Sequence, residues 1–111
     1  MNLKKQNIGS FESYILLSIR RLADDAYGTL IIEDVEQLTG REVSLGAVYT
    51  VLKRLENKRL VESRMGEPTG QRGGRAKRYF RLTTAGEICF QEHLRSLRRD
   101  AESFALAEVR S

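Results

Sequence analysis

The chain has 111 residues, of which 41% are hydrophobic and 31% charged, and its formal net charge is +4. This composition is typical of one soluble globular domain, and no apolar stretch approaches the roughly 20 residues of a membrane-spanning helix. The only cysteine is Cys89, which excludes an intrachain disulfide and zinc sites built from several cysteines. We therefore expect a cytoplasmic protein with no membrane association and no cofactor.

The first predicted element is a helix from about residue 11 to about residue 24, which follows a loose N-terminal arm. Apolar residues recur there at helical spacing, beginning with Phe11 and Ile15. Ser10 is the expected N-cap, because its hydroxyl can accept a hydrogen bond from the first turn. Tyr27-Gly28 is expected to separate this helix from the next one.

A second helix is predicted to follow, with Thr29 as its cap. Its apolar face carries Ile31, Val35 and Leu38, while glutamates occupy other faces. Gly40 is expected to end the helix, because glycine adopts the left-handed conformation at low cost.

A third helix is predicted to begin at the cap residue Ser44. Its expected core residues fall on one stripe: Leu45, Val48, Leu52 and Leu55. Small and basic residues occupy the opposite face. A helix that packs on a core and faces a polyanion has this asymmetry.

Residues 60–65 and 78–82 are predicted to form the two strands of a hairpin. The loop between them, from Gly66 to Arg75, carries four glycines and the only proline, so no packed element is expected there. Residues 72–81 contain five cations and no acid: Arg72, Arg75, Lys77, Arg78 and Arg81. Such a cluster indicates an anionic partner more specifically than the net charge does.

Thr84 and Glu87 have the spacing of a capping box and predict a last helix that continues nearly to residue 111. Apolar residues on this helix follow a heptad seam: Phe90, Leu94, Leu97, Ala101 and Phe104. We expect the seam, with Phe11 and Ile15 of the first helix, to form a homodimer interface, because an exposed apolar stripe needs cover. The alternative is that the helix packs only on its own domain.

The predicted order of elements is three helices, a strand, a basic loop, a strand and a last helix. This order describes a mainly α fold with a small β-hairpin, the winged helix-turn-helix plan. The expected division is a winged-helix DNA-binding domain with its N-terminal arm at residues 1–83 and a C-terminal dimerisation helix at residues 84–111. The third helix can enter a major groove, and the basic hairpin can reach phosphates. The expected DNA-binding residues are Ser44, Ala47, Tyr49, Thr50, Lys53, Arg54, Arg72, Arg75, Lys77 and Arg78.

Two segments resemble a known family. Residues 45–56, followed by Leu60-Val61, resemble the recognition-helix signature of the PadR family of transcriptional regulators. Residues 74–83, followed by Gly86, are similar to the wing of that family and to the entry of its last helix. The chain resembles the branch of the family that has a single, short C-terminal helix.

The chain departs from the family pattern at Thr50, where proline is common, and at Arg59, where glycine is common. The resemblance implies a dimeric repressor that binds an inverted repeat in a promoter. It also implies that the Tyr49 hydroxyl contacts a DNA phosphate. Some members release DNA when they bind a small hydrophobic molecule, so an effector of this kind is a candidate partner.

Two other classes of function remain open. A winged-helix adaptor that binds proteins rather than DNA would have the same fold, but it would not need the basic hairpin. An enzyme is not expected, because the chain has no nucleophile elbow, phosphate-binding loop or metal-ligand cluster. Cys89 and His93 lie four residues apart on the last helix, and a packing cysteine beside a surface histidine explains them better than a metal or redox site.

Overall fold

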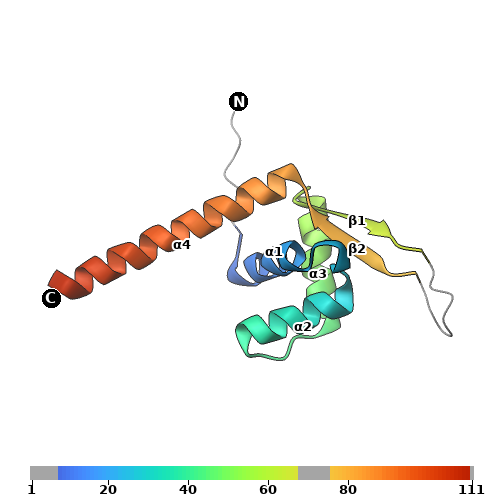
Figure 1. Ribbon diagram of the computed structural model, residues 1–111, viewed down its shortest axis with the longest axis horizontal. Helices are drawn as coiled ribbons and strands as arrows, with labels where there is room; N and C mark the ends of the chain where they lie inside the picture. The colour runs from blue at the N-terminus through green and yellow to red at the C-terminus, as the bar shows by residue number, and fades with distance from the viewer. Residues whose placement is uncertain (1–7, 68–75, 111) are drawn as a thin grey trace.

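The computed structural model describes residues 8–67 and 76–110. The elements follow the predicted order: α1 (Ser10–Leu22), the 3₁₀ helix η1 (Ala23–Asp25), α2 (Gly28–Thr39), α3 (Leu45–Asn57), β1 (Val61–Met65), β2 (Arg78–Leu82) and α4 (Thr84–Arg110). The first three α-helices form a body from which the hairpin and α4 project in opposite directions (Figure 1). This mainly α winged helix-turn-helix fold confirms the prediction. Within the two described ranges, no helix is long and apolar enough to cross a membrane.

The core lies where the three helices of the body meet the hairpin and the start of α4. Its largest fully buried apolar side chains are Ile15, Leu16, Ile19, Ile31, Val35, Val48, Leu52, Leu55, Leu60 and Phe90. The predicted stripe on α3 is wrong at Leu45, which is 53% exposed, while Val51 is buried. Packing of α3 therefore begins at Val48, and the whole first turn, through Ala47, stays at the surface.

The predicted caps of α1 and α2 are wrong by one or two residues. Gly9 rather than Ser10 precedes α1, and Tyr27 rather than Thr29 precedes α2. Both cap residues have extended backbone angles, and the side chain of neither cap residue makes a cap hydrogen bond. At α1, the Gly9 N–H instead donates to the Glu12 carboxylate at 3.1 Å, so the first turn supplies its own partner.

Two predicted boundaries around the helix-turn-helix are confirmed. Gly40 ends α2 in the left-handed conformation with φ 67°, and the Ser44 hydroxyl accepts the Ala47 N–H at 3.0 Å to cap α3. After α3, Arg59 also adopts a positive φ of 60°. This is the position where the family that the chain resembles commonly has glycine, and glycine is the residue that such a φ favours.

β1 and β2 pair antiparallel, in a register that joins Val61 to Leu82 at the body and Met65 to Arg78 at the outer end. Alternation places Ser63 and the buried Phe80 on the same face of the hairpin. The predicted tip of the hairpin, residues 68–75, lies outside the described residues.

α4 begins against the turn that connects α3 to β1. The Thr83 hydroxyl accepts the Gly86 N–H at 3.0 Å, so Thr83 rather than the predicted Thr84 caps the helix. Gly86 is buried, and a Cβ there would overlap the carbonyl oxygen of Leu60. Only glycine therefore allows the first turn of α4 to approach the body this closely.

The rest of α4 leaves the body. Cys89 and Phe90 belong to the core, so the first turns of α4 pack on the body. Every described side chain from Leu97 to Ala107 is exposed. The 27-residue helix is about 40 Å long, and the radius of gyration of 16.6 Å exceeds the roughly 13 Å of a compact domain of this size.

Candidate nucleic-acid interface

The exposed face of α3 carries most of the predicted DNA-binding residues. Ser44, Ala47, Tyr49, Thr50, Lys53 and Arg54 are all exposed. Two of their hydroxyls already have partners, since Ser44 accepts the Ala47 N–H and Thr50 donates to the Gly46 carbonyl at 2.8 Å. Lys53 and Arg54 make none of the ion pairs found between described residues, so α3 offers uncompensated positive charge.

Tyr49 combines a packed ring with an exposed edge. Its side chain is 39% exposed, and its ring meets Phe80 edge to face at 6.3 Å. The ring also lies against Gly28 at the start of α2. Tyr49 therefore serves packing, and it still has surface available to a ligand.

A shallow groove separates α3 from β2 and brings cations of both elements together. Its polar lining consists of Tyr49, Lys53, Glu56, Asn57 and Arg78, with the buried Leu52 and Phe80 beneath them. Positive charge from the third helix and from the hairpin therefore belongs to one continuous surface.

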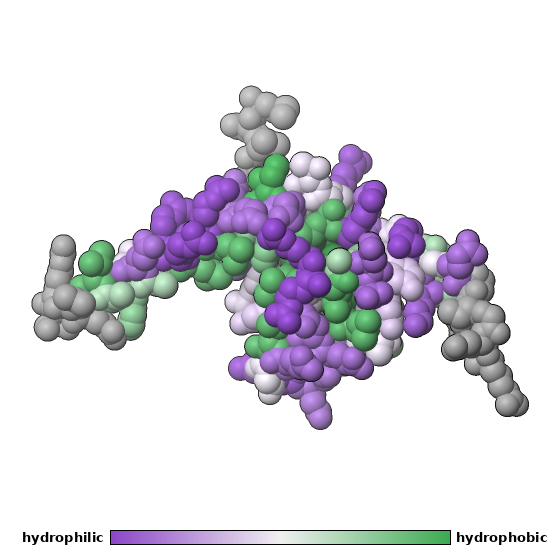
Figure 2. All heavy atoms as spheres, viewed as in Figure 1, coloured by the Kyte–Doolittle hydropathy of each residue, from purple (hydrophilic) through white to green (hydrophobic). Residues whose placement is uncertain are grey.

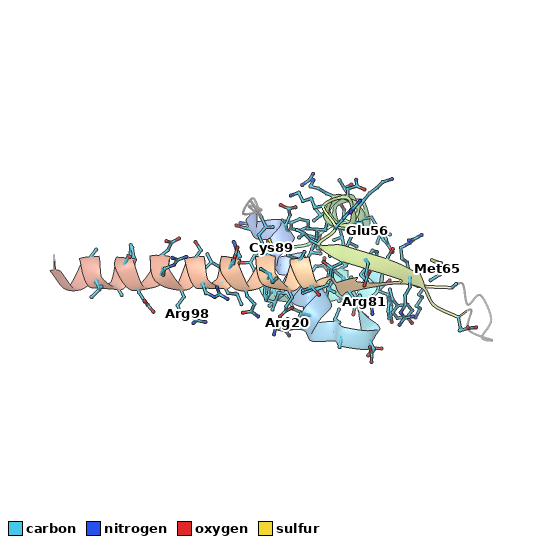
Figure 3. The ribbon with its side chains drawn as sticks, turned by 90° about the horizontal axis from the view of Figure 1, so that it is seen from above. Arg20, Glu56, Met65, Arg81, Cys89 and Arg98 are labelled. Atoms are coloured by element: carbon cyan, nitrogen blue, oxygen red, sulfur yellow. The ribbon has the colours of Figure 1, made fainter. Side chains whose placement is uncertain are left out.

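Arg78 is held in place by a short relay. One guanidinium N–H of Arg78 donates to the Ser63 hydroxyl at 2.9 Å, and that hydroxyl donates to the Glu56 carboxylate at 3.0 Å. Glu56 projects from the side of α3 that faces the hairpin. Figure 3 shows Glu56 close to the strands that carry the labelled Met65 and Arg81. The relay fixes the strand to α3 and leaves the remaining guanidinium donors of Arg78 available.

Two further cations flank the hairpin where it leaves the body. Lys77 lies over the Tyr27 ring, and Arg64 lies over the Tyr79 ring. Sequence reasoning predicted Lys77 but missed Arg64, because its position opposite Tyr79 depends on the strand register. The predicted Arg72 and Arg75 lie outside the described residues.

The arrangement of exposed groups suits a polyanion. The described ranges contain no group of three or more His, Cys, Asp or Glu side chains that could hold a metal ion. Cys89 is buried against the core, and its partly buried neighbour His93 lies one turn later. The exposed features of α3 and the hairpin are instead cations, hydroxyls and small side chains, which suit phosphates and base edges.

The residues predicted for a dimer interface fall into three groups, which are buried, partly buried and exposed in the single chain. Ile15 and Phe90 are at most 2% exposed within one chain, so they have no surface left for a second copy, and their prediction as interface residues is corrected. Phe11 and Leu94 are partly buried and pack against the same core.

The outer part of the seam is free in the single chain. Leu97 is 52% exposed, Phe104 is 67% exposed, and Ala101 between them is exposed too. Figure 2 shows hydrophobic residues along the underside of α4 and hydrophilic ones along its upper side.

Comparisons with known proteins agree with this geometry. The family model of the transcriptional regulator PadR-like family matches residues 15–92, from α1 to the first turns of α4. A PadR-like transcription factor from Bacteroides fragilis is 25% identical, covers 86% of this chain and 87% of its own, and superposes with a TM-score of 0.66. No match was found among curated proteins.

Two further solved structures have the same fold. A PadR family transcription regulator from Clostridium difficile is 24% identical, with 88% of this chain and 97% of that chain covered and a TM-score of 0.66. A putative transcriptional regulator from Thermoplasma acidophilum is 18% identical, with 91% and 90% covered and a TM-score of 0.67.

Proposed function

The chain belongs to the PadR-like family of transcriptional regulators, and from this premise we propose that it binds a palindromic promoter site as a homodimer and represses transcription. The observation that carries the DNA-binding part is the joint surface of α3 and β2. There, Lys53 and Arg78 line one groove with the half-exposed Tyr49.

The dimensions of α3 fit the proposed role. Its 13 residues span about 20 Å, and a helix of ordinary diameter enters the major groove of B-DNA. With the exposed first turn of α3 in the groove, the hairpin beside it reaches the adjacent phosphates. Each neutralised phosphate releases counterions, which makes the binding dependent on salt.

Base readout by α3 is expected to be modest. Gly46 and Ala47, in the exposed first turn, are too small to reach far into a groove. The hydroxyls of Ser44 and Thr50 are engaged within the helix, which leaves each with only part of its hydrogen-bonding capacity. We propose that specificity comes partly from DNA shape and deformability.

The homodimer part of the proposal rests on α4. Leu97, Ala101 and Phe104 continue, at heptad spacing, the face by which Phe90 and Leu94 contact the core. A second copy of α4 would cover this exposed seam, and residues 84–111 would then act as the dimerisation helix. Two copies of α3 related by a twofold axis would contact two half-sites of a palindrome.

Repression follows from occupancy, because a dimer bound over a promoter excludes RNA polymerase. The test is fluorescence anisotropy of the protein with its own upstream region and with a scrambled duplex across a salt series. Tighter binding to the upstream region, with a steep salt slope on both duplexes, is expected. Absence of salt-dependent binding to either duplex would favour the protein-binding adaptor instead.

A further inference from the structure

Four side chains lie together where the hairpin passes beyond the helical body, in the order cation, ring, ring, cation. The guanidinium carbon of Arg64 lies 4.9 Å from the centroid of the Tyr79 ring, and Lys77 Nζ lies 4.2 Å from the centroid of the Tyr27 ring. The two rings meet edge to face at 5.5 Å. Each cation is therefore close enough to be attracted by the ring quadrupole. We name these four side chains the root stack.

The root stack is anchored in the helical body through Tyr27. The Tyr27 N–H donates to the Asp25 carbonyl at 2.9 Å, and the Tyr27 carbonyl accepts the Ile31 N–H at 2.9 Å. Tyr27 also pairs with Tyr79 as an isolated antiparallel bridge, which joins the start of α2 to β2. Tyr27 therefore belongs to the helical body and fixes its end of the stack there.

The outer side of the root stack is closed by Gly66. Its N–H donates to the Lys77 carbonyl at 2.7 Å, one residue beyond the last pair of the strand register. A Cβ on Gly66 would stand 2.5 Å from Tyr79 Cε2, so the absence of a side chain lets the ring lie across the backbone. The direction in which the hairpin leaves the body is thus set by packed rings.

The two cations of the root stack are held without being neutralised. Neither Arg64 nor Lys77 takes part in an ion pair between described residues, whereas Arg81 of the same hairpin pairs with Glu62. Both cations are exposed. An aromatic ring restrains a cation without neutralising it, so the cation can still bind an anion.

We propose that Arg64 is a further DNA-contacting residue, and that Tyr27 and Tyr79 are positioning residues that hold Arg64 and Lys77 for DNA phosphates. These roles depend on the proposed DNA-binding function, and they add two aromatic side chains that orient the cations of the hairpin. Restraint before binding lowers the conformational entropy that long cationic side chains lose when they meet a phosphate.

A double-mutant cycle tests the positioning role. Affinity for a fluorescein-labelled mixed-sequence duplex at low salt is measured for Tyr27→Leu, Lys77→Gln and the double variant. Tyr27→Leu alone should weaken binding about two- to fivefold, and it should add little to Lys77→Gln, because the ring acts through that cation. Tyr27→Phe keeps the ring and should bind like the wild type. Fully additive effects would overturn the positioning role.

Arg64→Gln tests the contact without disturbing the rings. Its salt slope should fall by about 0.9 for each phosphate that the variant no longer neutralises. Arg81→Gln is the matched control, because it removes the same charge from the same hairpin at a residue already paired with Glu62. An equal effect of the two variants, or none from Arg64→Gln, would overturn the contact. Absence of salt-dependent binding by the wild type would overturn the proposed function and this inference together.

Discussion

The phenol ring of Tyr49 on α3 occupies the space that a side chain on Gly28, the first residue of α2, would need. A Cβ on Gly28 would stand 3.1 Å from Tyr49 Cε2 and closer still to the hydroxyl oxygen. The same ring meets Phe80 of β2 edge to face. Tyr49 therefore joins the start of α2, α3 and the hairpin at the surface proposed for DNA.

Gly28→Ala is predicted to destabilise the fold and to weaken DNA binding, although alanine is the better helix former. Forcing a methyl group against the Tyr49 ring should cost about 1–3 kcal/mol, because the ring is held by Phe80. Urea unfolding measures the change in the free energy of unfolding. Gly46→Ala is the control, since a Cβ there meets nothing within 4 Å, and it should gain about 0.5–1 kcal/mol. A Gly28→Ala protein as stable as Gly46→Ala would contradict the packing described.

Arg59→Gly is predicted to raise the free energy of unfolding by about 0.5–1 kcal/mol, since relief of left-handed strain exceeds the extra entropy of the unfolded chain. The strain is retained because the Thr83 hydroxyl donates to the Arg59 carbonyl at 2.7 Å, which fixes this turn. Thermal unfolding of the variant beside the wild type is the measurement. A lower melting temperature would mean that the arginine side chain contributes more than its backbone strain costs.

Leu97→Glu is predicted to turn a dimer into a monomer, because it would bury an unpaired carboxylate in the proposed seam. Light scattering across a concentration series measures the mass. Leu106→Glu is the matched control, since Leu106 is 59% exposed against 52% for Leu97 but lies on the opposite side of the helix. Loss of the dimer in both variants, or in neither, would place the interface elsewhere.

Stability at alkaline pH is predicted to depend on Cys89. Burial, and then the negative charge of Glu92, raise the pKa of the Cys89 thiol above its ordinary value. The folded chain therefore holds this proton more tightly than the unfolded chain does. The resulting stability is complete below the pKa of the unfolded thiol and is lost as the pH rises through the folded pKa. The free energy of unfolding in urea, measured from neutral to alkaline pH, should fall more steeply for the wild type than for Cys89→Ala. The same dependence of the free energy of unfolding on pH in both proteins would contradict this role of Cys89.

Element order and most of the core could be predicted, because apolar spacing reports local periodicity. Val48, Leu52 and Leu55 are buried as their spacing indicates. Leu45 has the same spacing but lies in the first turn of α3, beyond the reach of the neighbouring helices. The caps of α1 and α2 escaped prediction because Gly9 and Tyr27 make no side-chain cap bond.

The candidate site could be predicted only where a single element carries it. The exposed cations Lys53 and Arg54 follow from the pattern of one helix. Arg64 could not be found in this way, because its partner Tyr79 lies on the other strand and depends on the register. Heptad spacing likewise did not distinguish Phe90, which the body of the same chain covers, from Leu97, which it leaves exposed.

The most direct test of the proposed surface is the salt dependence of DNA binding by a Lys53→Gln and Arg78→Gln double variant. Its control is Arg95→Gln with Arg99→Gln, which removes the same charge from exposed positions on α4. The first variant should lower the slope of log affinity against log salt by about 0.9 for each phosphate left without its cation, while the control should keep the wild-type slope. Equal slopes for the two variants would contradict a DNA-binding surface made by α3 and the hairpin.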